Sequence, residues 1–166
     1  MTGRRLQVLS GVLVVALVGA LVGVVFLWRQ HSSDQDREHA TAAAEKAARS
    51  AVTEMTTYDY RTVEDDFAWV DDAGTDSFQS YFAGVSKPAI RFIRSVEASA
   101  TGDVVDSAAV YEDADHVRVL LFVDQQITSK GHRDAKLDQP RVTMHMVLEH
   151  GDWLVDEMQV NDVLTD

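Results

Sequence analysis

The longest hydrophobic run of the chain lies near its start. Between Arg5 and Arg29 there is no charged residue, and Val, Leu, Ala and Gly dominate residues 6–28, where Gln7 and Ser10 are the clearly polar side chains. A helix of this length spans about 35 Å and crosses a hydrocarbon core of about 30 Å with some tilt. The pattern predicts a transmembrane helix over residues 6–28, preceded by a short N-terminus over residues 1–5.

Basic residues near the two ends of this run favour one orientation. Arg4 and Arg5 precede the run, whereas Arg29 and Arg37 follow it. The numbers of arginines on the two sides of the run are nearly balanced, so the terminal amine and the short N-terminus decide the predicted orientation. We expect residues 1–5 in the cytoplasm and the domain that follows the span outside the plasma membrane.

A cleaved signal peptide is the alternative to an anchor. Its apolar region is typically about 7–15 residues and is followed closely by small residues. Here the run is longer, and residues 28–31 read Trp-Arg-Gln-His, which is a poor cleavage site. The run also contains Gly19 and Gly23 at G-x-x-x-G spacing, which allows close helix–helix approach, although glycine is common in such spans.

A narrow alanine face marks the next helix. Ser32 and Ser33 precede Asp34, a combination typical of a helix start. Small and apolar residues then recur every three or four positions: Ala40, Ala44, Ala47, Ala48, Ala51, Val52 and Met55. We expect a membrane-proximal amphipathic helix over residues 29–57.

Helical periodicity continues, with interruptions, to about residue 96. Thr62 and Asp65 resemble a capping box, and a short helix follows with Val63, Phe67 and Val70 on one side. The next expected helical face consists of Phe78, Tyr81, Phe82 and Val85, after which Pro88 resets the chain and Ile90 and Ile93 continue the stripe.

From about Thr101 the period changes to two, which indicates strands. The first is expected to place Val105, Ala109 and Tyr111 on one face. Further strands are predicted over residues 116–126, where both faces are apolar, and over 141–149 and 153–160. Residues 129–140 are predicted to form a polar loop, and residues 150–152 a tight reversal.

Helices followed by antiparallel strands indicate an α+β domain. We expect the helices to cover one face of a curved sheet, with residues 58–166 forming the remainder of the domain after the amphipathic helix. At this level the pattern resembles the cone-shaped nuclear transport factor 2-like (cystatin-like) fold.

Charge limits the partners. The chain carries a net charge of −12, and no acidic residue precedes residue 29. An acidic domain repels phosphate groups, so we expect neither nucleic acid binding nor direct docking on anionic lipid. The chain has no cysteine, which excludes disulfides and thiolate zinc sites.

Three segments carry a family resemblance. Thr56-Thr57-Tyr58-Asp59-Tyr60-Arg61-Thr62 behind a single span, Phe122-Val123-Asp124-Gln125, and Gly151-Asp152-Trp153-Leu154-Val155 resemble the Mce-associated membrane proteins of actinobacteria. The resemblance covers nearly the whole chain. It implies a protein that accompanies Mce lipid-import complexes, with its domain outside the plasma membrane, and it brings no catalytic residues.

Five titratable residues are the candidates for chemistry, because cone-shaped enzymes use a carboxyl or histidine in an apolar pocket. They are Asp59, Asp65, Asp66, Asp124 and His145. Ordinary roles explain each more simply. Asp59 suits a turn, Asp65 and Asp66 suit a helix's first turn, and His145 falls on the face opposite Met144 and Met146. Asp124, with Gln125 and Gln126, lies either at a pocket mouth or against a partner.

Neither a metal site nor a cofactor is expected, because the histidines have no ligand-like spacing: His31, His39, His116, His132, His145 and His150. We therefore predict a non-enzymatic accessory subunit of a lipid-import assembly, anchored in the membrane. One alternative is a lipid- or sterol-binding module with a pocket lined by Trp69, Phe78 and Phe82. The less favoured alternative is an isomerase- or cyclase-like enzyme.

Overall fold

The computed structural model describes residues 34–161. The predicted N-terminus over residues 1–5 and the predicted span over residues 6–28 lie outside the described residues. The chain divides into two compact units, Met1–Glu38 and His39–Asp166, and the α+β domain belongs to the second. Among residues 34–161, no helix combines the length and the apolar character that crossing a membrane requires.

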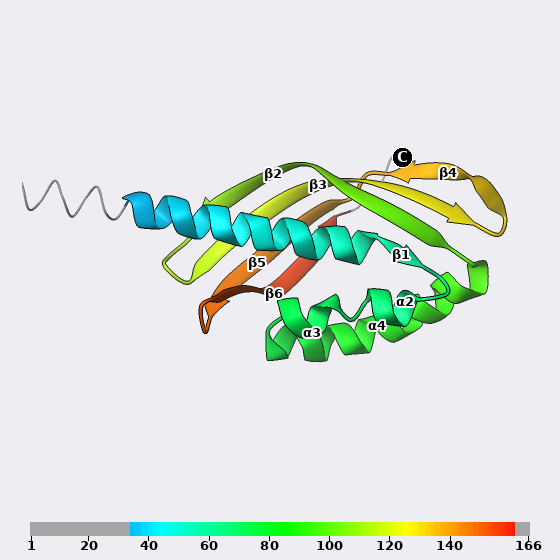
Figure 1. The fold of residues 1–166 in the computed structure, drawn as a ribbon, viewed down its shortest axis with the longest axis horizontal. Coiled ribbons are helices and arrows are strands. Elements are labelled where there is room, and N and C mark those ends of the chain that lie inside the picture. Colours follow the sequence, from blue (N-terminus) through cyan, green and yellow to red (C-terminus); the bar gives the residue numbers. More distant parts are fainter. Residues whose placement is uncertain (1–33, 162–166) are drawn as a thin grey trace, which may run out of the picture. The chain divides into compact units, whose positions relative to one another are not determined.

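The alanine-rich helix extends over residues 34–56. Its buried side chains are Ala44, Ala48, Ala51 and Val52, each at most 1% exposed. These small residues belong to the same core cluster as Val104 and Val119 of the sheet, so the helix packs closely on it (Figure 1). The predicted alanine face is thereby confirmed.

Short elements lead from this helix to a second long helix. Strand β1 (Tyr58–Asp59) is followed by α2 (Val63–Asp66), α3 (Trp69–Ala73) and α4 (Asp76–Val96). The side chain of Thr75 caps α4 by accepting a hydrogen bond from the Phe78 N–H at 3.2 Å. Pro88 lies inside α4, so the expected break there is wrong. Burial of Phe82 before it and Ile93 after it outweighs the local cost of proline.

The expected apolar face of α4 is only half buried. Phe78 and Phe82 are buried at 2% and 8% exposure, whereas Tyr81 and Val85 are 62% and 46% exposed. The four residues of the predicted helical face therefore divide, with Phe78 and Phe82 in the core and Tyr81 and Val85 exposed. The helix meets the rest of the molecule along a narrower arc than its apolar residues cover.

The antiparallel sheet contains β2 (Ser99–Tyr111), β3 (His116–Ser129), β4 (His132–Asp138), β5 (Arg141–Glu149) and β6 (Asp152–Asn161). Its order is β1-β2-β3-β5-β6, with β4 paired to the far end of β3. The predicted strand with two apolar faces, β3, lies between β2 and β5. The turn between β5 and β6 has positive φ at His150 and Gly151, as a tight hairpin requires.

The prediction of a loop over residues 129–140 is wrong, because β4 forms a hairpin with β3 there. Leu137 and Lys136 pair with Gln126 and Ile127. Residues 134–138 of β4 are exposed, so burial imposes no alternation of apolar and polar residues on this strand. The periodic signal on which strand prediction depends is therefore missing.

A bulge in β2 overturns another expectation. The pairing with β3 shifts register between Val104 and Asp106, so Val104 is buried at 7% exposure while Val105 is 53% exposed. Beyond the bulge, Ala109 and Tyr111 pack against the core as predicted. Placing Val105 on their face is wrong, since one extra residue reverses the side of every later side chain.

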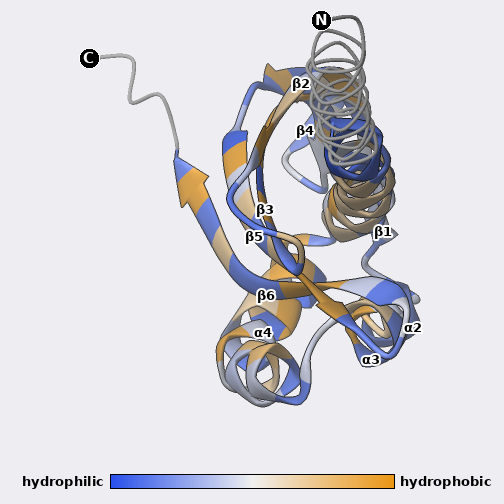
Figure 2. Cartoon of the chain, turned by 90° about the vertical axis from the view of Figure 1, so that its left-hand side faces the viewer, coloured by the Kyte–Doolittle hydropathy of each residue, from blue (hydrophilic) through white to orange (hydrophobic). Residues whose placement is uncertain are grey.

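The architecture is α+β, with helices on a curled antiparallel sheet. Figure 2 shows the strands curving around the side on which residues 39–56 of the long helix lie. The larger core cluster joins this helix, α3, α4 and the concave face of the sheet, and includes Phe78, Leu121 and Met144. A smaller cluster around Val63, Ile93 and Ala98 lies beneath α2.

Candidate functional site

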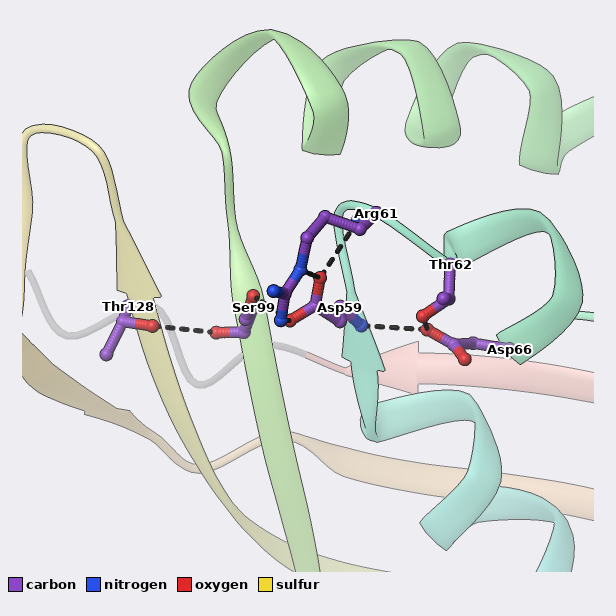
Figure 3. A network of polar contacts seen from close by, with 6 residues as sticks. All are labelled: Asp59, Arg61, Thr62, Asp66, Ser99 and Thr128. Atoms are coloured by element: carbon purple, nitrogen blue, oxygen red, sulfur yellow. Dashed lines mark hydrogen bonds and ion pairs between the residues drawn. The ribbon is translucent and has the colours of Figure 1, made fainter.

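Asp59, the first candidate for acid–base chemistry, is held in a network of polar contacts on the surface (Figure 3). The Arg61 guanidinium donates to both carboxylate oxygens of Asp59 at 2.7 Å, and the Arg61 backbone N–H donates to Oδ1 at 2.9 Å. Ser99 Oγ donates to Oδ2 at 3.1 Å. These bonds, first among them that from the Arg61 side chain, hold the pKa of Asp59 well below its usual value. Such a carboxylate is a poor proton carrier near neutral pH.

Asp66 organises the same turn from the other side. Its Oδ2 accepts hydrogen bonds from the Asp59 backbone N–H at 2.8 Å and from Thr62 Oγ1 at 3.0 Å. The expected capping box between Thr62 and Asp65 is not formed, because the Thr62 side chain makes no capping bond to the backbone. Asp65 is exposed. Both carboxylates thus have structural or solvated positions.

Asp124 and His145 lie elsewhere on the sheet. Asp124 on β3 is half-buried and accepts a hydrogen bond from Gln139 Nε2 at 2.7 Å. His145 on β5 is half-buried, between Arg118 on β3 and Glu157 on β6 in the register of the sheet. Among residues 34–161 no recorded contact joins Asp59, Asp124 and His145, so the fold does not gather the predicted candidates into one site.

Aromatic rings occupy the part of the interior in which the alternative hypothesis places a lipid pocket. Trp69 and Phe82 have ring centroids 5.6 Å apart, and Phe78 lies 5.9 Å from Phe82 and 6.2 Å from Trp69. These distances are those of rings in contact. One polar group there is unusual: the buried Trp69 Nε1–H has no hydrogen-bond partner within the described part of the chain.

Gln125, which the sequence left between a pocket mouth and a partner surface, has a third role. It is 8% exposed, and its Nε2 donates to the Thr56 carbonyl at 2.8 Å. That carbonyl is at the C-terminal end of the helix over residues 34–56, where backbone carbonyls have no hydrogen-bond donor within the helix. Gly102 on β2 lies against the same residue, since a Cβ there would stand 1.9 Å from Thr56 Oγ1. Together these contacts fasten the end of the helix to the sheet.

An open groove lies along the helix over residues 34–56. It has a volume of about 420 Å³, and small residues Ala43, Ala47 and Ala51 form one wall. The opposite wall comes from α3, β5, the β5–β6 turn and β6: Asp72, Ala73, Met146, Gly151, Asp152, Trp153 and Leu154. Trp153 is only partly buried and packs against the core from this groove. No signal in the sequence alone brings residues 43–54 and 151–154 together.

The charged side chains that line the groove are all carboxylates. Its acidic residues are Glu54, Asp72 and Asp152, and no basic residue lines it. Glu54 accepts a hydrogen bond from Ser50 at 3.1 Å along the helix surface. Within residues 34–161, no three His, Asp or Glu side chains gather as metal ligands do.

Comparison with known proteins identifies relatives of the sequence. The model of the family described as "Uncharacterized protein Rv1363c/MT1408-like" matches residues 6–153. Two similar proteins of Mycobacterium tuberculosis, the uncharacterized proteins MT1407 (strain CDC 1551) and Rv1362c (strain H37Rv), are each 26% identical over 145 residues. The match covers 87% of this chain but 66% of each relative, so the chain spans just under two thirds of their length.

Solved structures with a similar fold come from type IV secretion systems. An IcmL-like protein of Legionella pneumophila matches with a TM-score of 0.60 at 10% identity, covering 75% of this chain and 94% of that one. The periplasmic domain of DotI matches with a TM-score of 0.62 at 10% identity, covering 74% and 95%. CagV of Helicobacter pylori, a VirB8 homologue, gives 0.57 at 18% identity, covering 74% and 98%. At these identities the likeness shows a shared fold.

Proposed function

The chain belongs to the Rv1363c/MT1408-like family, and from this premise we propose a non-enzymatic, membrane-anchored accessory protein of an Mce-type lipid-import complex. In this proposal residues 6–28 span the plasma membrane and the α+β domain, of nuclear transport factor 2-like form, lies on its outer face. The domain binds other subunits of the complex and stabilises them. Confinement to the membrane raises the effective concentration of both partners, so a modest interface suffices.

The groove beside the helix over residues 34–56 is the observation that carries the proposal. It is open, and it has an alanine wall on one side and Trp153 and Leu154 on the other. Small residues let the backbone of a partner segment approach closely, and a partly exposed tryptophan is a frequent anchor of interfaces. Three carboxylates at its edge favour a partner segment that carries basic residues.

The three segments that resemble Mce-associated proteins support a structural role rather than a catalytic one. Thr56 and Gln125, from two of these segments, are joined by the buried hydrogen bond described above. Val155, from the third, accepts a hydrogen bond from the Thr75 backbone N–H at 3.0 Å and so connects β6 to the start of α4. These contacts hold together the scaffold that forms the groove.

Two variants of neighbouring alanines test the proposal. Ala42 and Ala43 are both exposed on the helix over residues 34–56, and Ala43 alone of the two lines the groove. In cells lacking the native protein, we expect Ala42→Arg to restore the abundance of Mce subunits and labelled-lipid uptake, and Ala43→Arg to fail. Equal restoration by both variants contradicts the groove as the interface. Unchanged abundance and uptake in the deletion strain itself contradict the accessory function.

The lipid- or sterol-binding module is the second candidate, and one observation favours it. The buried Trp69 Nε1–H lacks a partner among the described residues, and a ligand oxygen would satisfy it. Native mass spectrometry of the full chain released from detergent tests this candidate. A lipid that copurifies with the wild type and is lost in Trp69→Phe supports it, and a clean apo mass contradicts it.

A further inference from the structure

The surface of α4 carries an unusual pair of features side by side. Phe92 and Tyr81, at 66% and 62%, are the two most exposed large apolar residues of the described chain, and Val85 is 46% exposed. At about 100° per residue these positions and Pro88 fall within an arc of roughly 60°, so they form one stripe along the helix. The α4 stripe, defined as Tyr81, Val85, Pro88 and Phe92, lies beside the face that packs on the core.

Basic residues flank this stripe. Between Ser77 and Val96, α4 contains Lys87, Arg91 and Arg94 and no acidic residue. Arg94 pairs with Glu64 of α2, whereas Lys87 and Arg91 are exposed and have no recorded ion pair within residues 34–161. At about 100° per residue, both fall on the side of the stripe away from the core. In a chain of net charge −12, this is a local concentration of positive charge.

We propose that the α4 stripe docks on the surface of an anionic lipid bilayer, with Lys87 and Arg91 among the headgroups and Tyr81 and Phe92 at the acyl boundary. A helix with an aromatic and aliphatic face bordered by Lys or Arg is typical of interfacial binding. The inference rests on the proposed anchoring, which brings the domain within reach of the bilayer.

Net charge alone predicts no contact with anionic lipid, but local charge at α4 favours it. Charges farther apart than about 8 Å at physiological salt are largely screened from one another. The potential at α4 therefore depends on the bases of the helix more than on carboxylates across the domain. The same screening implies that docking weakens as salt rises.

Two single-cysteine variants measure the docking in the full chain. The chain has no native cysteine, and a side chain at Gly84 on α4 or at Gly131 in the β3–β4 turn meets nothing within 4 Å. Gly84→Cys and Gly131→Cys are labelled with an environment-sensitive fluorophore and reconstituted in phosphatidylglycerol-containing vesicles with lipid-bound quenchers. We expect quenching at residue 84 several-fold above that at residue 131, and a smaller contrast in phosphatidylcholine vesicles.

Matched substitutions separate the stripe from general effects. Lys87→Gln with Arg91→Gln is expected to lower the ratio of docked to undocked protein about 30-fold, since each base near an anionic surface contributes roughly fivefold. Lys46→Gln with Lys136→Gln makes the same change in net charge away from α4 and is expected to leave docking unchanged. Phe92→Gln is expected to weaken docking, whereas Leu137→Gln, at a residue 52% exposed on β4, is not.

The outcomes distinguish this inference from the proposed function. Equal, water-like signals at residues 84 and 131 in anionic vesicles overturn docking of α4. A label at residue 84 that is shielded from water but not reached by lipid-bound quenchers, and that crosslinks to a second copy, also overturns it. Alkaline carbonate extraction of the same vesicles tests the membrane anchor separately. If the chain resists extraction but α4 does not dock, the result contradicts the docking of α4 and leaves the proposed anchor intact.

Discussion

Gly102→Ala tests the contact that fastens the long helix to the sheet. A Cβ at this position would stand 1.9 Å from Thr56 Oγ1 and 2.5 Å from Thr56 Cβ. Thr56 is 3% exposed, and its hydroxyl donates to the Val52 carbonyl at 2.7 Å, so the side chain has little freedom to move away. The helix end or β2 must shift instead.

The magnitude follows from overpacking a rigid site. Extra methyl groups in well-packed positions cost about 1–3 kcal/mol, and the contact here involves the branched end of a held side chain. With a urea slope of about 1–3 kcal/mol per M, the midpoint of unfolding is expected to fall by roughly 1 M. Urea titration of the full chain in detergent, followed by Trp69 and Trp153 fluorescence, measures this change.

A matched glycine and a compensating substitution complete the experiment. Gly84→Ala, inside α4 with nothing within 4 Å, is expected to stabilise the chain by up to about 1 kcal/mol, since alanine is the better helix former. Adding Thr56→Gly to Gly102→Ala removes the atoms in conflict, and we expect a coupling energy above about 0.5 kcal/mol. A Gly102→Ala chain as stable as the wild type would refute the close approach, as would strictly additive effects.

Three further substitutions test other contacts. Gln125→Ala leaves the buried Thr56 carbonyl without its donor and is expected to cost about 1–3 kcal/mol in urea titrations, against less than about 0.5 kcal/mol for exposed Gln126→Ala. Thr75→Ala removes the cap of α4 and is expected to lower the unfolding free energy by about 0.5–2 kcal/mol, and an unchanged midpoint would contradict the cap. The hydrogen bond that the His116 Nδ1–H donates to the Asp113 carboxylate raises the pKa of His116 above 6.5, so this pair stabilises the fold below pH 6.5 and loses that effect as pH rises through the raised value. An NMR titration in which Asp113→Asn leaves the His116 pKa unchanged would argue against the pair.

Local patterns predict most of the architecture correctly. The alanine face of the helix over residues 34–56 can be recognised in the sequence because residues on one side of a helix recur every three or four positions. The strands β3, β5 and β6 are visible because the concave face of the sheet is buried, which imposes alternation on Val117, Val142 and Met144. Burial on one face produces the period along the chain, so the order of apolar and polar residues is enough to indicate these elements.

The errors occur where a long-range contact replaces that local signal. The guanidinium of Arg49 donates to the Val104 carbonyl at 3.0 Å and to Ser107 Oγ at 2.7 Å, on either side of the bulge in β2. Arg49 is more than fifty positions away in the chain, so no window around Val105 contains the group that stabilises the bulge. The continuation of α4 through Pro88 also depends on long-range contacts, because both ends of the helix pack on the rest of the domain.

The candidate site shows most clearly which features local sequence patterns predict and which depend on long-range contacts. Asp59, Asp66 and Asp124 are recognisable in the sequence as candidates, but only the structure shows that they bond with Arg61, Thr62 and Gln139. The groove is not predictable at all, because its walls come from residues 43–54 and 151–154, which only the packing of the helix on the sheet brings together.

By itself, the sequence determined the class of the fold, the uncharged run over residues 6–28 and the acidic character of the chain, because each depends on composition or on neighbours along the chain. The tertiary structure alone decided which apolar residues stay exposed on α4, where β2 changes sides and what lines the groove. These features depend on contacts between residues far apart in the sequence. The pattern of neighbouring residues along the chain does not show which of those contacts form.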